Sequence, residues 1–289
     1  MRADLLRIPG APRGPHAYRG GIAAYVIRSF MKIAFILSGA FLCAVVVRAE
    51  IPSGAQLAEH LDRVRRPVKS FSVGITLTEI RDGNVSRVGE YVVYARKVAS
   101  YPDFDTITIC KTPADDRGKV LLTKGNEAWL YDPKSARPVS ISYEKLRYRF
   151  FVAYGLTASF VQEYDGENLG EDKAVDAARK EHVCWHLKLT HRGKAGLVPE
   201  SLQYWLDKET LRPVRGQIYS SSGKLLRTAY YTEFKNVLDE IRPTHLPIVS
   251  GVERGLLTDV RFTDLAYRDT PANLYTREAM PAISQGTLP

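Results

Sequence analysis

Alternating apolar and polar positions fill most of the chain after Phe71 and predict many short β-strands. One earlier segment, residues 53–66, differs, because Leu57, Leu61 and Val64 recur at helical spacing. Ser53 can cap this helix and Pro67 ends it. The strands are expected at residues 71–81, 88–95, 105–110, 119–123, 127–131, 139–141, 181–190, 200–207, 214–219, 224–234, 244–250 and 255–266. Turn residues between these strands indicate an antiparallel meander.

Residues 118–142 carry the clearest pattern, in which strand, tight turn, strand, loop and strand follow one another. Gly125 and Asn126 tolerate the positive φ angles of a two-residue hairpin turn. The hairpin is apolar on both faces, with Val120, Leu122, Trp129 and Tyr131 on one face and Leu121, Ala128 and Leu130 on the other. We expect one face to pack on the helix of residues 53–66 and the other to form core or a cavity wall.

The sequence of this segment, GKVLLTKGNEAWLYDPKSARPVSIS, resembles the G-x-x-L-L-x-x-G-x-x-x-W-L-Y-x-P stretch of the LolA-like periplasmic lipoprotein-sorting carriers. Residues 184–189 resemble the family's cysteine-bearing strand, and residues 204–214 resemble its strand ending in W-x-D-x-x-T-x-x-P. Residues 222–228 and 242–244 resemble the G-K-L-L-K-T and R-P-T motifs. The resemblance implies an α+β, mainly β fold of the LolA/LolB type. In this fold a large curved antiparallel sheet forms an incomplete, half-open barrel, and helices cover a hydrophobic cavity.

The N-terminal 49 residues have the features of a leader. An apolar run from Ile33 to Val47 follows Met31-Lys32 and precedes Ala49, which predicts a signal peptide at residues 31–49 with cleavage after Ala49. The run is shorter than the ~20 residues of a membrane-spanning helix. We interpret residues 1–30 as a mis-called start or a disordered extension, with an unusually long n-region as the alternative. Residues 50–289 are expected to form a single domain in the periplasm.

Most of the positive charge lies in this leader. The net charge is +9 for the whole chain and falls to +3 after residue 49, because residues 1–49 contain seven Lys or Arg and one Asp. The remaining basic residues are spread among acidic ones without a dense stripe. A nucleic-acid partner is therefore not expected.

Cys110 and Cys184 are the two cysteines that remain after residue 49. An even pair in an exported protein is a disulfide candidate. Both lie on the polar side of their predicted strands, where a bridge is feasible if the strands approach one another. Two separate free thiols are the equal alternative, because spacing alone does not fix the pairing.

Catalytic motifs are missing from the sequence. It contains no G-x-S-x-G elbow, H-E-x-x-H, P-loop or Rossmann glycine pattern, so we expect neither an enzyme nor a cofactor. His182, Cys184 and His186 share a strand face, but the outer two lie about 13 Å apart at ~3.3 Å per residue. Zinc would need another ligand, such as His191, His60 or His245, so solvated histidines are the favoured interpretation and no metal site is predicted.

A cavity for acyl chains needs apolar walls and a mobile cover. The alternating rows of the strands at 181–190 and 200–207 supply inward walls, and the aromatic stretch 143–164 is too apolar for a solvated loop. A plain filled core is the default alternative for any one of these residues. The candidate cavity residues are Leu122, Trp129, Tyr131, Phe151, Tyr154, Leu156, Phe160, Val183, Trp185, Leu187, Leu189, Leu202 and Tyr204. The tail beyond about Met280 is expected to be loosely ordered.

The resemblance implies a soluble, monomeric periplasmic carrier that binds lipoprotein acyl chains or other lipids and moves them between the inner and outer membranes. It implies loading by an inner-membrane transporter of the ABC or RND-like type and delivery to an outer-membrane acceptor. The alternative is a periplasmic lipid or lipoprotein sensor, since the same fold occurs in regulatory binding modules. An exported metal enzyme and a structural envelope protein with a filled core are further rivals.

Overall fold

The computed structural model describes residues 50–100, 103–125, 127–135, 137–142, 155–193 and 199–288. Glu50–Pro289 is one compact unit. Residues 1–49 lie outside the described residues, so the signal peptide and the interpretation of residues 1–30 stay predictions. The candidate residues Phe151 and Tyr154 also lie outside the described part.

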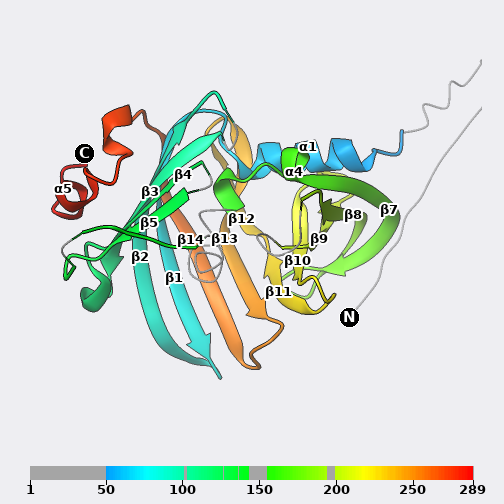
Figure 1. Ribbon diagram of the computed structural model, residues 1–289. Coiled ribbons are helices and arrows are strands. Elements are labelled where there is room, and N and C mark those ends of the chain that lie inside the picture. Colours follow the sequence, from blue (N-terminus) through cyan, green and yellow to red (C-terminus); the bar gives the residue numbers. More distant parts are fainter. Residues whose placement is uncertain are drawn as a thin grey trace, which may run out of the picture. The chain divides into compact units, whose positions relative to one another are not determined.

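One antiparallel sheet makes up most of the unit (Figure 1). Its strand order is β6-β5-β4-β3-β2-β1-β14-β13-β11-β10-β9-β8-β7, and β12 pairs with β13 beside this path. The strands are β1 Phe71–Arg81, β2 Asn84–Lys97, β3 Phe104–Thr112, β4 Val120–Lys124, β5 Glu127–Tyr131, β6 Val139–Ser140, β7 Tyr164–Val175, β8 Glu181–His191, β9 Ser201–Asp207, β10 Pro213–Tyr219, β11 Leu225–Tyr230, β12 Thr232–Val237, β13 Glu240–Ser250 and β14 Leu256–Tyr267. Within the described residues the end strands β6 and β7 do not pair with each other. The predicted sheet that does not close into a barrel is therefore confirmed.

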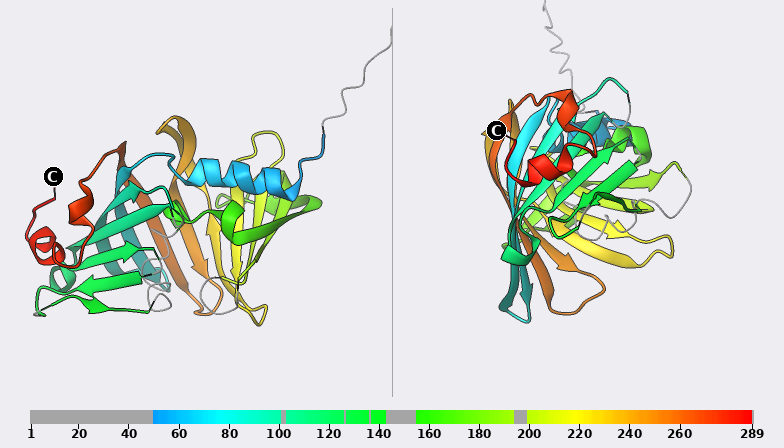
Figure 2. Two further views of the ribbon diagram at one scale, coloured as in Figure 1. Left: turned by 45° about the horizontal axis from the view of Figure 1, so that its top comes forward. Right: turned by 60° about the vertical axis from the view of Figure 1, so that its left-hand side comes forward.

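The helices in the described part of the chain are short. α1 spans Gly54–Arg65, α4 spans Phe160–Glu163 and α5 spans Met280–Ser284, with single 3₁₀ turns η1 at Ala114–Asp116 and η2 at Ala272–Leu274. Ser53 caps α1 as expected, because it accepts a hydrogen bond from Gln56 N while the Gln56 side chain accepts one from Ser53 N. α1 contacts β7, β8 and β13, and it lies across that half of the sheet in Figure 2. We call the side of the sheet under α1 the helix face.

Two apolar clusters lie on opposite faces of the sheet. The larger one lies on the helix face and includes Leu57 and Leu61 of α1, Val93 of β2, and Leu187 of β8. The second one includes Tyr94, the neighbour of Val93 on β2, and its other members are Ile107, Ile109, Val120, Leu122, Tyr131, Tyr275, Met280 and Ile283. Successive side chains of a strand point to opposite faces, so the C-terminal segment covers the face opposite α1. Figures 1 and 2 show α5 beside the strands at the other end of the sheet from α1.

The hairpin β4–β5 forms as predicted, with Lys124 paired to Glu127 across the turn. Its expected packing on α1 is wrong, because Val120, Leu122 and Tyr131 contact the C-terminal segment instead. The prediction that the tail beyond about Met280 is loosely ordered is also wrong, because Met280 and Ile283 are buried in this cluster. The predicted single strand at residues 224–234 is also corrected, because it divides into β11 and β12 at Tyr231.

Strand β7 has no counterpart among the predicted strands. Its residues Tyr164–Val175 lack alternating apolar positions. The reason lies at Gly166, where a Cβ atom would approach the carbonyl oxygen of Gly54 to 2.7 Å. Because α1 crosses β7 at such close range, the strand has glycine where the usual pattern has an apolar side chain.

Candidate functional site

A cavity lies on the helix face of the sheet, between α1 and strands β9 to β14. It contains about 890 Å³ of space not filled by atoms, part of which is open solvent. The lining residues are Val64, Arg65, Gly155, Leu156, Phe160, Pro199, Leu202, Tyr204, Gly216, Ile218, Ala229, Tyr231, Arg242, Pro243, Leu246, Ile248, Phe262 and Leu265.

The floor of the cavity is lined by small residues beside one large ring. Tyr204, Gly216 and Ala229 are partners across the neighbouring strands β9, β10 and β11. The ring of Tyr204 lies over Gly216, where a Cβ atom would approach a ring carbon to 2.8 Å. Gly216 thus makes room for the Tyr204 ring, and the small side chain of Ala229 leaves room above the floor.

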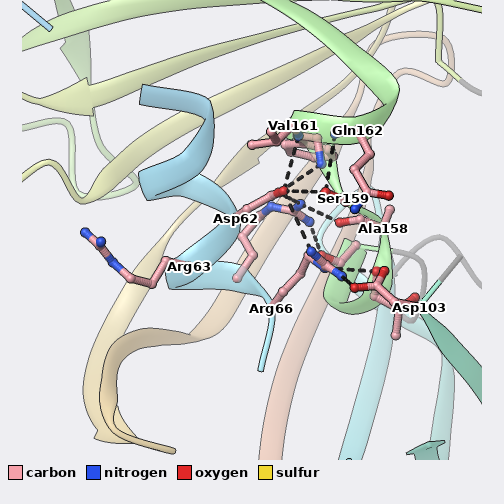
Figure 3. Close-up of polar contacts among 12 residues, drawn as sticks. Asp62, Arg63, Arg66, Asp103, Ala158, Ser159, Val161 and Gln162 are labelled. Atoms are coloured by element: carbon pink, nitrogen blue, oxygen red, sulfur yellow. Dashed lines mark hydrogen bonds and ion pairs between the residues drawn. The ribbon is translucent and has the colours of Figure 1, made fainter. Parts of the chain in front are cut away.

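The cover of the cavity is the segment 155–163, which ends in α4. Asp62 of α1 accepts hydrogen bonds from the backbone N of Phe160 at 3.0 Å and of Val161 at 3.2 Å. It also accepts one from the Ser159 hydroxyl at 2.9 Å (Figure 3). Asp62 therefore caps the short helix α4 from outside, and the negative charge suits a helix N-terminus.

Two arginines at the end of α1 bind the same segment. Arg65 donates to the carbonyl oxygens of Gly155 and Ala158, and it forms an ion pair with Asp62 at 2.8 Å. Arg66 donates from Nε to the carbonyl oxygen of Thr157 at 3.0 Å and pairs with Asp103 at 2.7 Å. The cover is thus attached to α1 mainly by polar contacts. Its one large buried side chain, Phe160, packs on the rings of Tyr164 and Tyr204.

Four polar side chains interrupt the apolar lining: Arg65, Tyr204, Tyr231 and Arg242. The Tyr231 hydroxyl donates to the Tyr204 hydroxyl at 3.4 Å. Burial raises the pKa of Tyr204, and it raises the pKa of Tyr231 well above its usual value, so both stay neutral at physiological pH. Arg242 donates to three backbone carbonyl oxygens, those of Arg63, Val64 and Val237.

The predicted cavity residues divide into four groups. Leu156, Phe160, Leu202 and Tyr204 line the cavity. Trp185, Leu187 and Leu189 of β8 belong to the same apolar cluster but lie outside the lining. Leu122, Trp129 and Tyr131 pack on the opposite face with the C-terminal segment, and Phe151 and Tyr154 lie outside the described residues. Contact of any of them with an acyl chain stays a prediction.

Val183 lies on the same face of β8 as Leu187 and Leu189, but its predicted place in an inward wall is wrong, since it is 48% exposed. It pairs with Lys173, whereas Leu187 and Leu189 pair with Asn168 and Gly166. The start of α1 touches β7 beside Leu187 and Leu189, because Gly54 contacts Gly166 and the Asn168 side chain donates to the carbonyl oxygen of Pro52. Val183 therefore points to the expected face of the sheet, but it lies beyond the end of the helix that would cover it.

The disulfide candidate is also wrong, because Cys110 and Cys184 are both free and buried. Cys110 lies in β3 and Cys184 in β8, and seven strands separate β3 from β8 in the sheet. Burial raises the pKa of the Cys184 thiol to about 12. The alternative of two separate thiols is the one that the structure has.

The histidine face of β8 is engaged by neighbouring polar groups. His182 contacts Asp176 at 3.1 Å and Asp207 at 3.2 Å. His186 bonds to Gln203 and stacks on the ring of Trp205, with 4.3 Å between the ring centroids. Across the described ranges of the chain, His, Cys, Asp and Glu side chains do not gather in threes with metal-binding geometry.

Several cavity residues were not among the sequence candidates, notably Gly216, Ala229, Tyr231, Arg65 and Arg242. Small residues and arginines carry no apolar signal in a strand pattern, so alternation could not find them. Arg242 does stand in the R-P-T motif of the resemblance, which was the one available signal.

Comparisons with known proteins agree on the fold. A family model described as an uncharacterized protein matches residues 103–282. A LolA superfamily protein from Nitrosomonas europaea superposes with a TM-score of 0.65 at 24% identity, over 79% of this chain and 99% of its own. A DUF1329 family protein from Desulfovibrio piger gives a TM-score of 0.65 at 19% identity, over 78% and 97% of the two chains.

A third solved structure, described as an outer membrane lipoprotein-sorting protein domain from Vibrio parahaemolyticus, gives a TM-score of 0.64 at 19% identity. It covers 79% of this chain and 98% of its own. Among curated proteins, none matches this sequence. Within the described residues, no helix has the length and apolar character needed to cross a membrane.

Proposed function

Because this chain belongs to the family of uncharacterized proteins matched over residues 103–282 and has the LolA-like fold, we propose that it is a periplasmic carrier of acyl chains. The cargo is the acyl part of lipoproteins or other lipids, and the binding site is the cavity under α1. The single observation that supports this most directly is the cavity itself, whose lining is apolar apart from four side chains.

The energetics of the cavity suit reversible binding. Each buried methylene contributes about 0.8 kcal/mol, so a chain of several methylenes gains useful affinity without becoming irreversible. Release requires the cover to move, and the cover is attached by separate polar contacts from Asp62, Arg65 and Arg66 rather than by a large apolar interface. Each of these contacts involves a charged side chain, so its net contribution is about 1.5–3 kcal/mol.

The carrier works between two membrane partners. An inner-membrane transporter of the ABC or RND-like type loads it, and an outer-membrane acceptor receives the cargo. The protein acts as a monomer, without cofactor, metal or covalent chemistry. The leader predicted at residues 31–49 takes it to the periplasm.

Native mass spectrometry of residues 50–289, purified from the periplasm without detergent, tests the binding step. Leu246→Glu places a charge in the cavity lining, whereas Val249→Glu places the same charge at a position of β13 that is 44% exposed. We expect co-purifying lipid with the wild type and Val249→Glu but not with Leu246→Glu. A lipid-free wild type that also fails to bind an added acyl-chain probe would overturn the proposal.

Transfer is tested separately, by following labelled lipid from loaded protein to acceptor vesicles. Delivery to vesicles that contain outer-membrane extract supports the carrier. Binding without any delivery would instead leave the sensor or regulatory module as the function.

A further inference from the structure

Two of the polar side chains that line the cavity, Arg65 and Arg242, lie beside the C-terminus of α1. Arg242 of β13 donates from Nη1 to the carbonyl oxygens of Arg63 at 2.9 Å and Val64 at 2.8 Å. The next residue of the helix, Arg65, also lines the cavity. Its positive charge acts on the hydroxyls of both Tyr204 and Tyr231, so Arg65 lies near the tyrosine pair.

The charge at this end is not balanced. Arg65 is paired with Asp62, but Arg242 is only 3% exposed and forms no ion pair with a described residue. Its Nε and Nη1 bind carbonyl oxygens, and no described residue accepts a hydrogen bond from Nη2. Helix carbonyls carry only a partial negative charge, whereas buried cations are ordinarily paired with an anion. Asp239 and Glu240 act electrostatically on Arg242, but neither forms an ion pair with it or lines the cavity. The lining itself therefore holds an unmatched positive charge and a spare donor.

The two tyrosines add a second donor. The Tyr231 hydroxyl donates to that of Tyr204, so the Tyr204 proton is left over, and no described residue accepts it. The separation of 3.4 Å is long for a bond between hydroxyls, which prefer about 2.8 Å. A ligand oxygen beside Tyr204 would satisfy the unused proton.

We propose that the ligand is an anionic amphiphile, whose acidic head lies at Arg242 and the Tyr204–Tyr231 pair while its acyl chain lies on the apolar floor. This proposal rests on the proposed function and names the class of lipid that the cavity selects. A cationic head would meet two arginines, and a neutral head would leave the charge of Arg242 unmatched. A carboxylate or a phosphate monoester has the required chemistry, because both accept charge-assisted hydrogen bonds from arginine.

Four probes share a twelve-carbon chain and differ in the head group, so they separate the contribution of the head group to the affinity from that of the chain. They are laurate, dodecyl phosphate, dodecanol and dodecyltrimethylammonium. Calorimetric titration of residues 50–289 at pH 7.5 measures the affinity of each. We expect at least one anion to bind about tenfold or more tightly than dodecanol, the scale of a charge-assisted hydrogen bond, and the ammonium to bind most weakly. Preference for laurate over dodecyl phosphate, or the reverse, identifies the source of the acidic group.

Two variants test the assignment of residues. Arg242→Gln and Tyr204→Phe should each weaken anion binding severalfold while leaving dodecanol binding nearly unchanged. Arg63→Gln is the matched control, because its side chain is 53% exposed and pairs with Glu240 outside the cavity lining. It removes the same charge from the neighbourhood of α1 and should keep the preference for anions. Tyr204→Phe preserves the ring, so it carries the test if Arg242→Gln does not fold.

The outcomes separate this proposal from the proposed function. Equal affinity of the wild type for dodecanol and both anions would overturn the head-group assignment while leaving the carrier intact. An anion preference that survives both Arg242→Gln and Tyr204→Phe would also overturn it. Failure of all four probes to bind would overturn the carrier itself.

Discussion

Both faces of the sheet carry apolar clusters, but in the described residues they are covered differently. The C-terminal segment packs large side chains on one face, which we call the filled face, whereas the other encloses a cavity. On the face opposite α1, Tyr275, Met280 and Ile283 of the C-terminal segment are fully buried against β2 to β5. On the helix face, the cover contributes Phe160 and Leu156, while the small side chain of Ala229 leaves space on the floor. Apolar strands alone thus do not decide between core and pocket.

What decides is the way the covering segment is attached. The C-terminal segment inserts large side chains into the sheet, so removing it would expose apolar surface on both sides. The cavity cover is held at its backbone by Asp62, Arg65 and Arg66, and Phe160 is its one large buried side chain. Its movement therefore breaks mainly polar contacts, which water can replace. The first arrangement gives stability, and the second gives a cover that can open.

The largest effect is expected on the filled face. Ile283→Asp places a charge at a position that is 1% exposed, within the cluster of Met280 and Tyr275. Burying a charge without a partner should lower the free energy of unfolding by about 3–5 kcal/mol or detach the C-terminal segment. Urea unfolding measures the loss, and laurate binding by the folded fraction should be unchanged. Loss of binding at unchanged stability would break the distinction between the two faces.

The next effect reverses the comparison by filling the cavity. Ala229→Phe adds a ring beside Gly216 on the floor, so laurate affinity should fall tenfold or more while stability changes by no more than about 1–3 kcal/mol. The control is Val120→Phe, which places the same ring in the filled cluster. It should cost stability without affecting binding. If Ala229→Phe binds laurate as the wild type does, the cavity is not the acyl site.

The sequence predicts the strands that have strong local signals and misses features that depend on contacts between distant segments. Strands β1 and β5 begin and end at the predicted residues, because their apolar rows and flanking turn residues are strong local signals. β7 was missed because its contact with α1 requires Gly166 rather than an apolar side chain. The break at Tyr231 was missed because the row of apolar residues continues through it.

The site could be predicted only in part. Leu202 and Tyr204 follow from alternation in β9, and they do line the cavity. The sequence could not show which segment packs on the β4–β5 hairpin, because both faces of the hairpin are apolar. The C-terminal segment that packs on it lies more than 140 residues later in the chain. Arg242 and Asp62 are charged residues in amphipathic elements, where the pattern alone indicates exposure. Their burial depends on long-range contacts that periodicity does not contain.

A smaller effect is expected from loosening the cover without changing the lining. Asp62→Asn keeps the size of the side chain but removes the charge that binds Arg65 and the backbone of Phe160 and Val161. We expect a loss of about 1–3 kcal/mol in stability and faster release of bound laurate in stopped-flow displacement. Glu59→Gln, at an exposed position of α1, is the matched control and should change neither quantity. Unchanged release from Asp62→Asn would show that the cover does not control exchange.

The smallest effect is the pH dependence of stability at Asp103, which pairs with Arg66 beside the cover. Burial raises the pKa of Asp103, but hydrogen bonds from Lys97 and Arg66 together outweigh it and lower the pKa below its usual value near 3.8. A carboxyl group with a lowered pKa stabilises the folded state above its unfolded pKa, and this contribution is lost as the pH falls through the folded value. Asp103→Asn should therefore be less stable than the wild type at pH 7, by about 1 kcal/mol or less because the pair is partly solvated. Urea unfolding at pH 7 and pH 3 should show this gap narrowing in acid, whereas a gap of constant size would mean that Asp103 stabilises the cover by shape rather than by charge.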